Sequence, residues 1–285
     1  MDKDSRPPFR VVPASRGLAW LITAANLLRQ QTWRLLTVAV LVQLAMTLTR
    51  LPVIGLIVAL GLPILTAGML HCFDQVRRGL PLSPVALFAP LGNRRLAMRL
   101  FLLGGLIGLI AIILISWLLS GIQELQDPEL LARIEQGDIE AVLALDPAVV
   151  QRAFFAIVIG VSVSGTLGYF SVPLIWFGEM RMGQAITTGI KALVKNWLAF
   201  LLLGVILVAL SLPIFLVLGL LMGVTAVAGG PGIIQYVLIL FAVLLIQLLM
   251  FGTQYCAYAE IFELGDGEGN GPVDDSEARE DQFVA

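Results

Sequence analysis

The sequence predicts an all-α integral membrane protein with six transmembrane helices and additional amphipathic helices at the membrane surface. Hydrophobic residues make up 58% of its 285 residues and charged residues 13%, whereas soluble proteins carry about 25% charged residues. Runs without Asp, Glu, Lys or Arg recur along the chain, and the longest, 196–259, covers 64 residues. A helix needs about 20 apolar residues to cross the hydrocarbon core. The runs therefore predict spans at about 33–50, 53–72, 97–119, 148–178, 197–222 and 233–259.

The first part of the chain leads from a polar end into a pair of spans. Residues 1–14 contain three prolines and are expected to form a flexible cytoplasmic N-terminus, followed by a membrane domain over residues 15–259. Residues 15–31 place their apolar side chains on one helix face, a pattern typical of a helix that lies in the membrane interface. The span at 33–50 is the shortest, and Pro63 is expected to kink the span at 53–72.

The middle of the chain adds a second interfacial helix and an acidic loop. The helix is expected at 83–91, where Gly92-Asn93 ends it. Residues 120–146 hold seven acids and one base and are expected to form an acidic periplasmic loop. Asp127-Pro128 and Asp146-Pro147 each join an N-cap residue to a proline at the first helical position. They predict short helices in the loop and the start of the span at 148–178.

Small residues recur every four positions in the span at 148–178, at Ala156, Gly160, Ser164 and Gly168. Residues four apart share one face of a helix, and small side chains let a second helix approach closely. This face is a candidate for packing against a neighbouring span of the same chain. The alternative is that it forms a homo-oligomer.

The last third of the chain has the same arrangement. Residues 182–195 form a third amphipathic stretch, and a Gly-rich turn separates the last two spans. Residues 260–285 carry nine acids and one base and are expected to form a disordered acidic cytoplasmic tail, because such a composition cannot bury a core. An interfacial helix thus precedes a pair of spans three times, which indicates a degenerate repeat.

The basic residues indicate the orientation in the membrane. With the N-terminus inside, 15 of the 18 Lys and Arg residues lie on the cytoplasmic side and three on the other side, namely Arg50, Arg133 and Arg152. Cytoplasmic loops carry an excess of Lys and Arg. Both termini are therefore expected in the cytoplasm.

The stretch Val12-Pro13-Ala14-Ser15-Arg16-Gly17-Leu18-Ala19-Trp20 resembles the start of a family of uncharacterised bacterial inner-membrane proteins, whose members carry V-P-A-x-R-G-x-x-W before the first of six spans. Leu62-Pro63, Ala67-Gly68 and Arg78-Gly79-x-Pro81-Leu82 are also similar to this family. Lys195-Asn196-Trp197 is distantly similar to the membrane region of glycerophosphodiester phosphodiesterases. The resemblance implies a multi-pass protein of the bacterial inner membrane with a domain of unknown function, and it transfers no catalytic residues.

Few residues could carry chemistry. His71 is the one histidine of the chain and stands beside Cys72 and Asp74 at the end of a span. These three lie too close along one helical turn for a metal site, which needs several converging donors. We therefore predict no catalytic residue, no metal site and no cofactor. The net charge of −2 gives no general attraction for nucleic acid.

Five arginines cluster between the spans at 53–72 and 97–119: Arg77, Arg78, Arg94, Arg95 and Arg99. Their role in setting orientation is sufficient to explain them. They are also candidates for contacting anionic lipid headgroups, since each basic residue contributes about 1 kcal/mol to binding at an anionic membrane surface.

The sequence leaves two functions open. The first is a non-enzymatic membrane scaffold or modulator that contacts lipids, other membrane proteins or a second copy of the chain, as the interfacial helices and the small-residue face suggest. The second is a transporter or permease component for an uncharged or amphiphilic solute. Pro63, Pro173 and Pro213 lie inside spans, and broken helices often line transport sites. A membrane enzyme ranks third.

Overall fold

The structure, a computed structural model, describes residues 9–120, 122, 127–135, 145–227 and 232–263. These residues form helices and their connections, with no strand among them, which confirms the all-α class. Within the described ranges, four helices are long and apolar enough to cross a membrane, and a pair bent by 49° could form a fifth span. They are α5 (Arg94–Leu119), α8 (Pro147–Tyr169) with α9 (Ser171–Trp176), α11 (Trp197–Val227), α12 (Ile233–Ile261), and the bent pair α3 (Pro52–Leu60) and α4 (Leu62–Arg77).

The helices at the first two expected spans differ from the expectation. The span expected at 33–50 is α2 (Thr32–Thr47), an apolar helix of 16 residues that continues as the 3₁₀ helix η1 (Leu48–Arg50). The span expected at 53–72 is broken at Gly61. Pro63 lies in the first turn of α4, where its missing N–H leaves no hydrogen bond unmade. By length and composition, the described helices account for four to five of the six expected spans.

Other elements depart from the expectation at prolines and at the chain ends. The stretch expected at 83–91 is the 3₁₀ helix η2 (Pro84–Gly92), since in an α-helix the ring of Pro90 would clash with the carbonyl four residues before it. In the acidic loop, α6 (Pro128–Glu135) begins after Asp127, whose carboxylate accepts the N–H of Glu129 at 2.9 Å. Residues 1–8 of the expected N-terminus, 136–144 of the loop and 264–285 of the tail lie outside the described residues.

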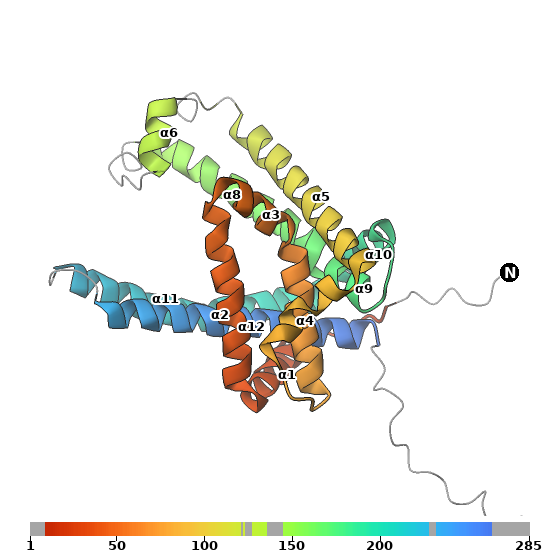
Figure 1. The fold of residues 1–285 in the computed structure, drawn as a ribbon. Helices are drawn as coiled ribbons and strands as arrows, with labels where there is room; N and C mark the ends of the chain where they lie inside the picture. The colour runs from red at the N-terminus through yellow and green to blue at the C-terminus, as the bar shows by residue number, and fades with distance from the viewer. Residues whose placement is uncertain (1–8, 121, 123–126, 136–144, 228–231, 264–285) are drawn as a thin grey trace, which may run out of the picture.

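The described helices form three pairs that share one packed end (Figure 1). The pairs are α2 with α3 and α4, α5 with α8 and α9, and α11 with α12. Each pair follows one of the three short helices at the amphipathic stretches that the sequence predicts for the membrane surface. We call these the surface helices: α1 (Arg16–Gln30), η2 and α10 (Met182–Lys195). At the packed end lie the largest buried side chains, including Trp20, Phe73, Phe170 and Tyr255. The pairs α5–α8 and α11–α12 diverge toward their far ends (Figure 1), where large apolar side chains such as Trp117 and Leu216 are exposed.

The surface helices join the three pairs into a closed ring. Helix η2 packs against α4, α10 against α9, and α1 against α12, so each surface helix lies on the second member of one pair and leads into the next. Glycines permit this approach: a Cβ atom on Gly68 of α4 would overlap Leu87 O of η2, and one on Gly17 of α1 would overlap Ala199 O of α11. Lipid tails are as apolar as leucine, so helices in a membrane associate through close packing and hydrogen bonds.

Between α1 and α2, the side chain of Gln31 binds the segment that leads into η2. Helix α4 ends at Gly79, whose φ of 70° is left-handed, and the N–H of Leu80 closes the helix end on Gln75 O. Gln31 Nε2 then donates to Leu80 O at 2.7 Å, and Gln31 Oε1 accepts the N–H of Leu82 at 2.9 Å. One amide thus fixes the entry into the second surface helix.

Between α10 and α11, Asn196 makes the same contact with the segment that leads into α1. Its Oδ1 accepts the N–H of Val12 at 2.7 Å, and its Nδ2 donates to Arg10 O at 3.0 Å. The N–H of Arg10 also donates to Ile261 O at 2.8 Å. Residues 9–14, expected to be flexible, are therefore anchored, because their backbone groups have partners far along the chain.

Replacing Asn196 by alanine should loosen the chain's first described residues. Asn196 is 2% exposed, and its loss leaves several backbone groups without a partner, at a cost of about 1–3 kcal/mol. We expect Asn196→Ala to lower the thermal unfolding midpoint in detergent and to speed protease cleavage within residues 9–14.

Asn93→Ala is the matched control. Asn93 occupies the corresponding junction before α5, but its exposed side chain accepts only the N–H of Leu96, at 3.3 Å. Equal midpoints and equal cleavage rates for the two variants would contradict the anchoring role of Asn196.

Candidate functional site

A cluster of charged side chains joins α1 to α12 at the packed end. Arg16 Nε and Nη2 donate to the two carboxylate oxygens of Glu260 at 2.7 and 2.9 Å, and Trp20 Nε1 donates to Glu260 Oε2 at 2.7 Å. The hydrogen bond with Glu260 raises the pKa of Arg16, which keeps the guanidinium charged. A paired, two-point contact of this kind fixes both the distance and the rotation between two helices.

A second cluster joins α4 to α12. Tyr255 Oη donates to Asp74 Oδ1 at 2.8 Å, and Arg78 Nε lies 2.9 Å from Asp74 Oδ2. Both Asp74 and Tyr255 are buried. Burying the Asp74 carboxylate without these hydrogen-bond partners would cost much free energy. Asp74, which the sequence placed beside His71 and Cys72, therefore has a structural partner on another helix.

An open pocket of about 550 Å³ separates the two clusters. Its charged lining consists of three arginines and two glutamates: Arg10, Arg16, Arg77, Glu260 and Glu263. Arg10 and Glu263 are largely exposed and lie 3.3 Å apart. The lining has a formal charge of +1, because most of its charges are balanced.

The five arginines predicted as a lipid-contacting set lie in different surroundings. Arg77 lines the open pocket, and Arg78 pairs with Asp74. Arg99 Nη1 donates to Glu179 O at 2.8 Å and to Met180 O at 3.2 Å, which binds the segment before α10. Arg99 thus binds the segment before the next surface helix, as Gln31 and Asn196 do, although it lies inside α5 and not at the junction before it.

Arg94 and Arg95 are exposed, as are Arg77 and Arg78. Arg94 and Arg95 both lie in the first turn of α5 at the packed end. Among the described residues, neither has a hydrogen bond or ion pair. An anionic headgroup that binds these two side chains would therefore displace no partner among the described residues.

A second pocket of about 550 Å³, also open to its surroundings, lies between α4, α5, α8 and α12, within the length of the apolar helices. We call it the intramembrane cavity. Five of its lining residues are glycines, and the absence of their side chains leaves the space open: Gly104, Gly108, Gly160, Gly165 and Gly168. Its few polar groups include Thr66, Ser164, Tyr169 and Gln254.

The predicted small-residue face lies along α5 and borders this cavity. A Cβ atom on Gly160 would lie 2.9 Å from the side chain of Ile115 on α5, and Ala156 is buried. Ser164 Oγ donates to Gly160 O in its own helix at 2.8 Å. Gly168 leaves ordinary contact distance to α5. In this structure the face packs against a helix of the same chain.

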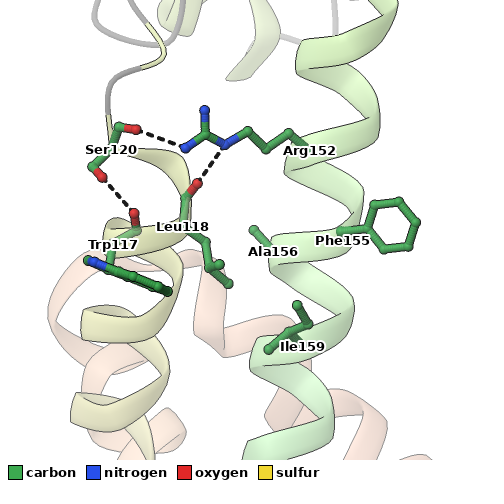
Figure 2. A pocket seen from close by; sticks show the side chains of 7 residues that line it. All are labelled: Trp117, Leu118, Ser120, Arg152, Phe155, Ala156 and Ile159. Carbon is green, nitrogen blue, oxygen red and sulfur yellow. Dashed lines mark hydrogen bonds between the residues drawn. The ribbon is translucent and has the colours of Figure 1, made fainter.

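At the far end of the α5–α8 pair, Arg152 closes a small pocket of about 270 Å³ (Figure 2). Its Nε donates to Leu118 O at 2.9 Å and its Nη2 to Ser120 O at 3.1 Å. These carbonyls belong to the C-terminal end of α5, where a positive charge is favourable. Arg152 therefore joins the two helices at the end opposite the packed one.

A double-mutant cycle on Arg16→Gln and Glu260→Gln should reveal a coupling of about 1 kcal/mol in the free energy of unfolding. The pair is bidentate, which strengthens it, but both side chains are partly exposed, which weakens it. The matched cycle on Arg10→Gln and Glu263→Gln should give no measurable coupling, because both side chains are more than 60% exposed. Chemical unfolding in mixed micelles, followed by tryptophan fluorescence, measures both. Equal coupling in the two cycles would contradict a special role for Glu260.

No family model, curated protein or solved structure matches the chain, so the resemblance carried by residues 12–20 stays a prediction.

Proposed function

We propose that the chain is a non-enzymatic scaffold or modulator of the bacterial inner membrane, which contacts lipids or other membrane proteins through its helix pairs. The distribution of burial carries this proposal. The core lies at the packed end, whereas no more than 17% of the most apolar window of each long helix is buried inside the described chain. The far halves thus present a large apolar surface to their surroundings, as expected of a site for lipids or partner helices.

The charged residues of the packed end support a role without catalysis. Glu260 is bonded to Arg16 and Trp20, and Asp74 to Tyr255 and Arg78. Groups held in such pairs hold helices together, whereas catalysis needs an acid, base or nucleophile beside a substrate.

The proposal includes six spans with both termini in the cytoplasm. Helix α2 with η1 extends about 30 Å, since α-helical residues rise about 1.5 Å and 3₁₀ residues about 2.0 Å each, and the hydrocarbon core is about 30 Å thick. The surface helices and the helix starts at the packed end hold most of the described bases, among them Arg16, Arg94 and Lys195, whereas the far ends hold Arg50, Arg133 and Arg152. The excess of bases at the packed end supports a cytoplasmic location for it.

Labelling of single cysteines tests this orientation. In a Cys72→Ala/Cys256→Ala background, whose replaced thiols are buried, we expect a membrane-impermeant maleimide to label Glu129→Cys of α6 in intact spheroplasts. Gln184→Cys of α10, which is equally exposed, should react only after permeabilisation. The reverse pattern would invert the orientation, and labelling of both sites from outside would contradict the spans.

Mass spectrometry of material that copurifies in native-lipid nanodiscs tests the function. We expect one membrane protein or one lipid class to be enriched relative to an unrelated six-span protein extracted in parallel from the same cells, because the exposed helix pairs offer a specific surface. Recovery of bulk lipid alone would contradict the scaffold role.

A transporter component for an amphiphilic solute is the second candidate, and one observation favours it. Two interrupted helices border the intramembrane cavity: α3–α4, broken at Gly61, and α8–α9, broken at Phe170. Pro213 does not add to this argument, since α11 passes through it without a break. Flux of a labelled amphiphile across proteoliposomes would favour this candidate over the scaffold.

A further inference from the structure

The intramembrane cavity has the length of one membrane leaflet. Its wall on α5 runs from Gly104 to Ile115, across the middle of that helix. At about 1.5 Å per residue this is about 16 Å, close to half of a hydrocarbon core of about 30 Å. A single hydrocarbon chain therefore fits along it.

The cavity is polar at one end. Gln254 and Tyr169 line it toward the packed end, while Ile115 and Val161 line it toward the far end. Gln254 is only 7% exposed. Its Nε2 donates to Tyr169 O at 2.6 Å, but its Oε1 accepts no hydrogen bond from a described residue. The buried hydroxyl of Tyr169 also lacks a partner among the described residues.

Buried polar groups in proteins almost always have a hydrogen-bond partner. At one end of this cavity, the hydroxyl of Tyr169 is such a buried group without a partner among the described residues, and Gln254 Oε1 is an accessible acceptor. An occupant would therefore gain from a hydroxyl at this end and an apolar chain at the Ile115 end. The volume of about 550 Å³ falls within the range of about 300–1,000 Å³ typical of ligand pockets.

We propose that the intramembrane cavity binds a single-chain amphiphile with a free hydroxyl on its head, such as a monoacylglycerol. Its chain lies between α5 and α8, and its hydroxyl donates to Gln254 Oε1. This inference rests on the proposed function, since it names one class of lipid that the membrane protein contacts.

Photolabelling of the full chain in nanodiscs tests the proposal. The probe is a monoacylglycerol with a diazirine near the end of its chain, and the comparison probe is the methyl ester of the same fatty acid, which has no hydroxyl. We expect saturable labelling of residues near Ile115 and Val161 by the monoacylglycerol, mapped by peptide mass spectrometry. The methyl ester should label this site about tenfold less, the ratio expected for one buried hydrogen bond.

Two variants with a matched control locate the site. Gly165 lines the cavity, and a Cβ atom there meets nothing within 4 Å, so Gly165→Leu should fill the space without a clash and lower labelling about tenfold. Gly219→Leu on α11, at an equally open position outside the cavity, should leave labelling unchanged. Gln254→Leu should remove the preference for the monoacylglycerol over the methyl ester.

Labelling that does not saturate, or that is equal in Gly165→Leu and Gly219→Leu, would overturn the proposal and identify ordinary bilayer contact. The proposed function would survive that result if the copurification experiment still recovered a specific lipid class or protein. If neither experiment gave a specific signal, both the cavity site and the scaffold role would fall.

Discussion

The contact between α1 and α12 brings together the first and last described helices of the chain, and the ring of helix pairs depends on it. Arg16 and Trp20 of α1 converge on Glu260 of α12, while Asn196 binds the segment just before α1. Without these contacts, η2 and α10 would still join neighbouring pairs, but the third pair would have no polar connection back to the first surface helix. The stretch from Val12 to Trp20, on which the predicted family resemblance rests, therefore contains residues that connect the first described helix to the third helix pair.

Helix pairs that pack together only at one end leave their other ends exposed, unlike a bundle packed along its whole length. In a bilayer, apolar side chains gain little by leaving lipid for protein, so packing must come from close backbone approach and from hydrogen bonds. Gly17 and Gly68 provide the first at the packed end, and Gln31 and Asn196 provide the second. The far halves of α11 and α12 have neither in comparable measure, and they stay apart from α5 and α8 (Figure 1). On α8, a Cβ atom on Gly165 would meet nothing within 4 Å, so this glycine leaves space instead of contact.

Much of this fold could be predicted from the sequence, because charge-free runs and amphipathic periodicity are local properties. They predict the all-α class, the approximate positions of the long helices and the three surface elements.

The breaks at Gly61 and Phe170 were not predicted to the residue, since a proline kinks or restarts a helix depending on what its neighbours pack against. The 3₁₀ form of η2 was not predicted, because the start and stop signals on which that expectation rested do not distinguish a 3₁₀ helix from an α-helix. The pairing of Arg16 with Glu260 joins residues 244 positions apart, and a single sequence has no local signal for it. The sequence does contain one further indication of buried positions. Gly68 and Cys72 of α4 have the same spacing as Gly252 and Cys256 of α12, and all four residues are buried.

The same separation of packed and far ends explains where a ligand could bind. In the two clusters of the packed end, the carboxylates of Glu260 and Asp74 are already paired, so a ligand that binds Arg16 or Arg78 would have to compete with them. In the intramembrane cavity the balance is reversed, because Gln254 keeps an acceptor without a donor and the neighbouring glycines keep space without side chains. A molecule that brings its own hydroxyl on a hydrocarbon chain meets both requirements, and the membrane is the compartment in which such molecules are concentrated.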